Sequence, residues 1–96
     1  MLEIRTSCEN CRKPLPYDSS EAMICTFECT FCKDCVDRIF KNVCPNCGGG
    51  LEKRPIRPKS LLAKYPVSTV IVYQPINEAE FKIKQERLID IPLGER

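Results

Sequence analysis

Histidine is absent from this chain of 96 residues, and its second half contains no cysteine. Without histidine, the commonest general base of hydrolytic enzymes and a frequent ligand of catalytic zinc are both missing. If every cysteine binds metal, no nucleophile and base pair remains, so we expect no enzymatic activity.

Long apolar runs are absent as well. No stretch approaches the roughly 20 residues of a membrane-spanning helix, so no transmembrane segment is expected. The opening residues, Met1 to Arg5, lack the basic and apolar regions of a secretory signal. The chain is therefore predicted to work in the reducing cytoplasm, where disulfides are rare.

The chain is instead rich in cysteines with the spacing of metal ligands. Cys-x-x-Cys pairs occur at 8/11, 29/32, 32/35 and 44/47, and Cys25 completes a set of eight. Two sulfurs bound to one Zn²⁺ at about 2.3 Å lie roughly 3.8 Å apart, which two intervening residues in a tight turn can provide. Because eight thiolates fill two closed tetrahedral sites, the sequence predicts two Zn²⁺ ions per chain.

Two other uses of the cysteines stay open. An even number of cysteines in a short chain is typical of a disulfide scaffold, although the expected reducing compartment disfavours one. Iron bound as in rubredoxin uses the same geometry of four thiolates. Zinc is the metal that we expect.

Two segments have the composition of a tight metal-binding turn, and we call them the first knuckle (residues 8–11) and the second knuckle (residues 44–49). In the second knuckle, Pro45 presets the turn, and Asn46 and the glycines tolerate a positive φ. In the first knuckle, Asn10 suits a left-handed position. Each knuckle is expected to supply two ligands.

The pairing of the cysteines depends on a helix predicted to begin near Asp34. Val36, Ile39, Phe40 and Val43 have the spacing of one helical face. A pair of cysteines at the start of this helix needs a partner pair from a separate knuckle, and residues 23–29 are predicted to form one arm of a hairpin. The expected sites are therefore interleaved: Cys8, Cys11, Cys32 and Cys35 form site 1, and Cys25, Cys29, Cys44 and Cys47 form site 2. Sequential pairing, with the first four cysteines on one ion, is the alternative.

Between residues 8 and 47, the order of the cysteines resembles the cross-brace spacing of RING-type domains, with Cys29 where that family usually has histidine. Residues 1–5, 24–32 and 44–49 also resemble a family of small bacterial cysteine-rich proteins of unknown function, over a match from Met1 to about Pro58. That resemblance implies zinc and no established activity. Ubiquitin-ligase activity is not expected, because Glu9 and Asn10 replace the usual apolar contact residue and Gly48 replaces the usual basic residue.

The predicted fold is a small α+β zinc-stabilised module of treble-clef or RING-like type, with two four-cysteine zinc sites and a short C-terminal extension. The module spans residues 1–50, a basic proline-containing linker spans residues 51–60, and the extension spans residues 61–96. Residues 1–50 contain few large apolar groups, so metal must supply much of the folding free energy. Eight thiolates contribute −8 and two Zn²⁺ contribute +4, which takes the net charge from +2 to −2.

The linker carries the local basic patch, formed by Lys53, Arg54, Arg57 and Lys59. A stretch of this kind could lie along nucleic-acid phosphates. A solvated linker is the simpler interpretation, because no aromatic residue is interleaved for base stacking.

The extension is expected to contain a short helix after Ser60, a strand over residues 67–73, and a helix or a strand over residues 78–91. Asn77 and Glu80 form a plausible capping box before Phe81, yet alternating apolar residues also fit a strand. This segment is too short to bury its own apolar residues, so it docks on the module, on a second copy or on another protein.

Three classes of function agree with these features. The first is a structural zinc module that contacts a protein partner or associates with itself through the extension. The second is a nucleic-acid-binding zinc protein that uses the linker. The third is zinc storage or redox sensing, which closed and buried thiolate sites disfavour.

Overall fold

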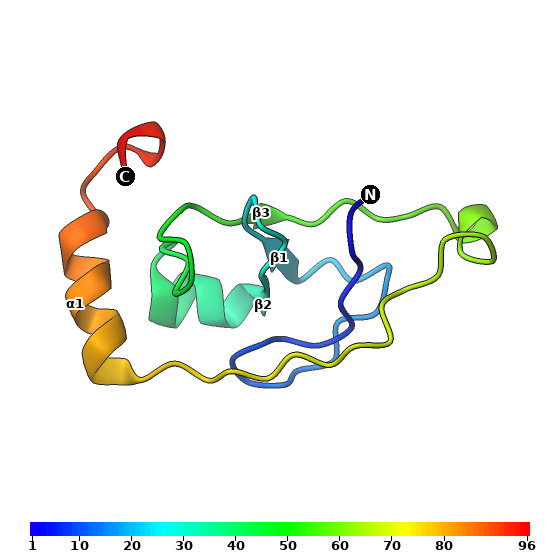
Figure 1. The fold of residues 1–96 in the computed structure, drawn as a ribbon, viewed down its shortest axis with the longest axis horizontal. Helices are drawn as coiled ribbons and strands as arrows, with labels where there is room; N and C mark the ends of the chain where they lie inside the picture. Colours follow the sequence, from blue (N-terminus) through cyan, green and yellow to red (C-terminus); the bar gives the residue numbers. More distant parts are fainter.

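A small antiparallel sheet lies at the centre of an elongated molecule of 42 × 25 × 18 Å (Figure 1). The central strand β1 (Ala22–Ile24) pairs with β2 (Thr30–Cys32) on one side and with β3 (Glu52–Lys53) on the other. In the register, Met23 lies opposite both Phe31 and Lys53. The computed structural model describes all residues from 1 to 96.

The chain turns from β2 into the helical segment η1 (Cys35–Phe40), which has π-helical hydrogen bonding. Val36 and Phe40 are buried as predicted, and so is Val43 beyond the end of η1. Ile39, however, is 43% exposed. The π-helix explains why Ile39 is exposed. Its turn is wider than that of an α-helix, so Ile39 points away from the face that Val36 and Phe40 share.

The hydrophobic core contains 14 buried residues, and six of them are cysteines. Its aromatic centre is a chain of edge-to-face contacts: Phe31 to Phe40 at 4.8 Å between ring centroids, and Phe40 to Phe81 at 5.3 Å. Phe81 comes from the C-terminal extension, so the extension completes the core of the module rather than standing apart from it.

The C-terminal extension folds back along the module (Figure 1). After the 3-10 turn η2 (Lys59–Leu61) at one end of the molecule, the chain returns in an irregular path to α1 (Glu78–Leu88) at the other end, and η3 (Leu93–Glu95) follows. The short helix predicted after Ser60 is thus a 3-10 turn that begins at Lys59. With 11 residues, α1 is the longest helix, and none of the helices combines the length and apolarity that crossing a membrane requires.

The predicted strand over residues 67–73 does not form. Two separated backbone bonds hold this part of the chain: the Ser68 N–H donates to the Ile4 carbonyl at 2.9 Å, and the Gln74 N–H donates to the Glu9 carbonyl at 2.8 Å. No continuous ladder connects them, although the segment is β-branched. Residues 67–73 thus form no strand in spite of their composition, because no neighbouring strand edge pairs with them.

The ambiguity between helix and strand after Asn77 is resolved in favour of a helix over 78–88. The side-chain oxygen of Asn77 accepts a hydrogen bond from the Glu80 N–H at 3.2 Å, which is the N-cap interaction that the sequence suggested. Phe81 is the buried residue of this helix, whereas Ile83 is 71% exposed. The alternation of apolar residues was therefore misleading.

The basic linker is part of the folded module. Residues 52–53 form strand β3, and Arg54 is only 1% exposed. The Arg54 guanidinium donates hydrogen bonds to the carbonyls of Arg5, Leu15 and Pro16, the last at 2.9 Å. Arg54 therefore stabilises the packing of the N-terminal loops and does not belong to a surface patch.

Arg57 is similarly engaged. Its guanidinium donates to the carbonyls of Leu2, Tyr65 and Pro66, at 2.6, 2.9 and 3.4 Å. These bonds connect the start of the chain to the C-terminal extension. Of the four predicted basic residues, only Lys53 and Lys59 are exposed.

Candidate metal centres

The first cysteine cluster contains Cys8, Cys11, Cys32 and Cys35, whose sulfur atoms all lie within 4.8 Å of one another. The Sγ atoms of Cys8 and Cys35 are 3.9 Å apart, and those of Cys11 and Cys32 are 3.7 Å apart. Tetrahedral coordination of one Zn²⁺ by thiolates requires separations of roughly 3.8 Å. The cluster therefore has the dimensions of a four-thiolate zinc site.

Three elements hold the sulfurs of the first cluster. The first knuckle supplies Cys8 and Cys11, the end of β2 supplies Cys32, and the start of η1 supplies Cys35. Thus the pairs 8/11 and 32/35 come together in space although they are far apart in the chain. These are the four residues that the interleaved prediction assigned to site 1.

The second cluster brings together Cys25, Cys44 and Cys47, again with all sulfurs within 4.8 Å of one another. Cys29, the fourth residue expected in site 2, lies outside this set of three. Its sulfur nevertheless accepts a hydrogen bond from Asn46 Nδ2 at 3.3 Å, which places it beside the second knuckle. Three sulfurs are therefore close enough to share one metal ion, and the fourth lies beside the second knuckle.

Cys25 and Cys29 lie at the two ends of the turn that joins β1 to β2. The sequence predicted that residues 23–29 form a hairpin arm, but the strand ends at Ile24. The Glu28 N–H donates to the Cys25 carbonyl at 3.1 Å, and Glu28 has a φ of 65°. The Cys25 N–H also donates to the Cys29 carbonyl at 3.3 Å, so the turn brings the two cysteines together. A continuous strand, which rises about 3.3 Å per residue, would hold them far apart.

The two knuckles have the same backbone design. In the first, the Cys8 N–H donates to the Lys13 carbonyl and the Arg12 N–H donates to the Cys8 carbonyl, both at 2.9 Å. In the second, Cys44 makes the equivalent pair of bonds with Gly49 and Gly48, both at 2.8 Å. The residue after the second cysteine has positive φ in both, 68° at Arg12 and 81° at Gly48.

Each knuckle also carries an asparagine directly before its second cysteine. Asn10 Nδ2 donates to Cys35 Sγ at 3.4 Å, and Asn46 Nδ2 donates to Cys29 Sγ at 3.3 Å. Such bonds stabilise negative charge on a thiolate and orient the ligand. The sequence alone indicates both asparagines as turn formers, and the repeated pattern Cys-x-Asn-Cys is the signal for their shared second role.

Burial dominates the protonation of the cysteines in the metal-free chain. It raises the pKa of Cys32, Cys35 and Cys44 above the ordinary value of a thiol. At Cys11, burial also acts to raise the pKa, but a hydrogen bond from the Lys13 backbone and contacts with neighbouring sulfurs lower it overall. Without metal, buried thiols of this kind hold their protons, and a metal ion must displace them.

Glu9, the residue next to Cys8, is 2% exposed. Its carboxylate accepts a hydrogen bond from the Thr30 N–H and forms an ion pair with Arg5 Nη1 at 2.8 Å. The Glu9 N–H in turn donates to the Thr30 carbonyl at 3.0 Å. Glu9 therefore fixes the first knuckle against β2, which carries Cys32, and its charge is compensated within the fold.

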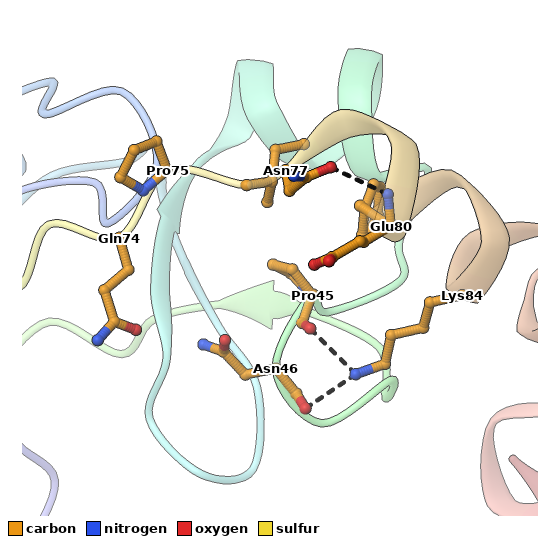
Figure 2. Close-up of a pocket in the computed structure, with 9 residues that line it drawn as sticks. Pro45, Asn46, Gln74, Pro75, Asn77, Glu80 and Lys84 are labelled. Atoms are coloured by element: carbon orange, nitrogen blue, oxygen red, sulfur yellow. Dashed lines mark hydrogen bonds between the residues drawn. The ribbon is translucent and has the colours of Figure 1, made fainter.

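The C-terminal helix contacts the second knuckle (Figure 2). Lys84 Nζ donates to the carbonyls of Pro45 and Asn46 at 3.0 and 2.9 Å, and Gln85 donates to the carbonyls at the end of η1. Beside these contacts is an open cleft of about 350 Å³ whose lining is mostly polar. Helix α1 thus supports the loop that presents Cys44 and Cys47.

Substitution of Gly48 by alanine is expected to destabilise the protein by about 1–3 kcal/mol. A Cβ atom at this position would lie 2.7 Å from Leu88 Cδ1, and the φ of 81° is unfavourable for a residue with a side chain. Urea denaturation of the metal-loaded protein measures the loss. Gly94→Ala is the matched control, because its Cβ would meet no atom within 4 Å; equal effects of the two substitutions would contradict the prediction.

The part of the chain that matches a known protein family includes all eight cysteines. A model of the family described as "Protein of unknown function (DUF1272)" matches residues 1–57. "Uncharacterized protein R02474" of Rhizobium meliloti (strain 1021) is 56% identical over 75 residues, which make up 78% of this chain and 89% of that protein. No solved structure matches the chain. These matches confirm the resemblance to a small bacterial family of unknown function.

Proposed function

The chain belongs to the DUF1272 family of unknown function, and we propose that it is a structural zinc protein that acts by binding another protein. Two Zn²⁺ ions would be bound by thiolates alone: Cys8, Cys11, Cys32 and Cys35 at the first cluster, and Cys25, Cys29, Cys44 and Cys47 at the second. The observation that carries the proposal is the set of four sulfurs within 4.8 Å in the first cluster. This donor set and spacing fit zinc, which favours closed tetrahedral thiolate sites for structural roles.

The proposal includes an interleaved, cross-brace arrangement of the RING or treble-clef type. It is supported by the first cluster, in which residues 8 and 11 meet residues 32 and 35, while residue 25 meets residues 44 and 47. A small change in the β1–β2 turn would complete the second site, because Cys29 is already hydrogen-bonded to Asn46. The bound metal would then join the knuckles to the sheet and to the start of η1.

A binding role is favoured over catalysis by the chemistry of the donors. Four thiolates leave zinc no open position for water or substrate, which catalytic zinc requires. The chain also has no histidine that could act as a base beside the metal. Exposed apolar side chains on the surface, such as Phe27 at 72% and Val70 at 60%, are candidates for contact with a protein partner in the cytoplasm.

Cobalt substitution tests the closed coordination of both sites. With Co²⁺ bound to four thiolates, we expect the intense visible bands of tetrahedral coordination and strong sulfur-to-cobalt charge transfer at both sites. Addition of azide or cyanide at low concentration should leave the spectrum unchanged, because no position is free. A spectrum of five- or six-coordinate cobalt, or one that shifts with added ligand, would overturn the proposal.

The affinity for zinc is expected to increase with pH by at least about tenfold per unit between about pH 6 and pH 8. Burial raises the pKa of Cys35 and Cys44 in the metal-free chain, so these thiols are protonated throughout this range and must release protons when metal binds. In a plot of the logarithm of zinc affinity against pH, each proton released on binding increases the slope by one. Competition with a chromophoric chelator measures it, and an affinity independent of pH would contradict the prediction.

A further inference from the structure

The side chain of Asn10 bridges the first cysteine cluster and the C-terminal extension. Its Nδ2 donates to Cys35 Sγ at 3.4 Å, and its Oδ1 accepts from the Ile76 N–H at 3.0 Å. Only one orientation of the amide satisfies both partners, since the nitrogen must face the sulfur and the oxygen must face the N–H group. The amide is thus fixed between a candidate metal ligand and a segment 66 residues further along the chain.

Two neighbours of Asn10 hold the same part of the extension. The Gln74 N–H donates to the Glu9 carbonyl at 2.8 Å, and the Arg12 guanidinium lies 4.8 Å from the centre of the Tyr73 ring. Residues 9–12 therefore contact residues 73–76 at three points. This is the loop that supplies two of the four sulfurs of the first cluster.

We propose that Asn10 is a positioning residue that couples metal binding at the first cluster to docking of residues 73–76. The inference rests on the proposed function, because it requires a metal-bound thiolate at Cys35. A thiolate is a stronger acceptor than a thiol, and hydrogen bonds at the two ends of one amide strengthen each other. Metal bound at the first cluster therefore stabilises the docked conformation of residues 73–76.

Coupling of this kind is reciprocal. If metal favours the docked extension by some factor, the docked extension favours metal by the same factor, and such factors are typically about 5 to 150. The coupling thus predicts that a change at Ile76, which is not itself a candidate ligand, weakens metal binding at the first cluster. If Asn10 acted only within the first knuckle, changes at residue 76 would leave metal binding at the first cluster unaltered.

The second cluster provides an internal comparison. Asn46 donates to a sulfur as Asn10 does, but its connection to the extension runs through its backbone carbonyl, which accepts from Lys84 Nζ. The Asn46 side chain has no hydrogen bond to the extension. Changes at residue 76 are therefore expected to affect the first cluster and to spare the second.

The test uses the full chain loaded with zinc and exposed to a limiting amount of chelator, with the rate of cysteine alkylation measured peptide by peptide. Ile76→Pro removes the N–H that donates to Asn10, and Ile76→Val keeps it. For Ile76→Pro we expect about tenfold faster alkylation of the first cluster and an unchanged rate at the second. Ile76→Val should behave as the unmodified chain does. Equal acceleration at both clusters, or none at either, would overturn the coupling.

A second pair of variants covers the case in which proline at residue 76 disturbs the extension more widely. Asn10→Asp replaces the donor to Cys35 by a carboxylate that repels a thiolate, and it keeps an acceptor for the Ile76 N–H. We expect it to open the first cluster selectively, whereas Asn46→Asp should open the second. If the unmodified chain shows no protection by zinc, the proposed function itself fails; if zinc protects but neither pair is selective, only the coupling fails.

Discussion

Removal of the metal is expected to unfold residues 1–57, with loss of the native circular dichroism spectrum and of resistance to proteases. Structural zinc contributes on the order of 10 kcal/mol per ion in model fingers, whereas the net stability of a small domain is only about 5–15 kcal/mol. The buried core consists of 14 residues, of which six are cysteines. When the metal leaves, the thiols no longer hold these segments together, and the remaining apolar contacts are too few to do so.

Titration with a strong chelator under reducing conditions, followed by circular dichroism, measures this effect. The reductant keeps the released thiols from forming disulfides, so that loss of structure reports loss of metal. Renewed addition of zinc is the control and should restore the native spectrum. A chain that keeps its native spectrum with all metal removed would show that packing alone stabilises the fold.

The second large effect is expected at Arg54, whose replacement by alanine should cost about 3–5 kcal/mol. The guanidinium donates to three backbone carbonyls of the N-terminal loops, two of them at Leu15 and Pro16. Truncation would leave these acceptors without partners in a region where Arg54 itself is 1% exposed. Burial lowers the pKa of Arg54, but an arginine remains charged at any pH at which the protein is folded.

Urea denaturation of the zinc-loaded variants tests the role of Arg54. Lys53→Ala is the matched control, because Lys53 is the neighbouring cation on β3 and is exposed; its effect should stay within about 0.5 kcal/mol. Arg54→Lys should be intermediate, since lysine cannot reach three carbonyls in the fork geometry of a guanidinium. Similar stabilities for the alanine variants at 53 and 54 would show that Arg54 is not structural.

The cysteine framework was predictable because its information is local. Two residues between cysteines set the separation of the sulfurs, and Pro45, Asn46 and the glycines identify the second knuckle as a tight turn. The pairing of residues 8 and 11 with residues 32 and 35 required only one further step, the placement of a helix near Asp34. The structure brings the first of these sets together and places Cys29 just outside the second.

Features that depend on distant contacts were not predictable. Residues 67–73 have the composition of a strand, but whether a strand forms depends on a free sheet edge, which the sequence does not specify. Arg54 and Arg57 have the appearance of a solvated basic patch, because nothing in the sequence indicates that backbone carbonyls more than 35 residues away accept their hydrogen bonds. The hydrogen bond between Asn10 and Ile76 was also not predictable, because the two residues are 66 positions apart in the chain.

The central claim, two zinc ions held by eight thiolates, is tested most directly by native mass spectrometry of the full chain produced in zinc-supplemented medium. We expect one dominant species whose mass equals that of the chain plus two zinc ions minus four protons, because the two ions carry four positive charges. A chain that carries one zinc ion or none, or whose mass shows cysteines joined in disulfides, would contradict the account.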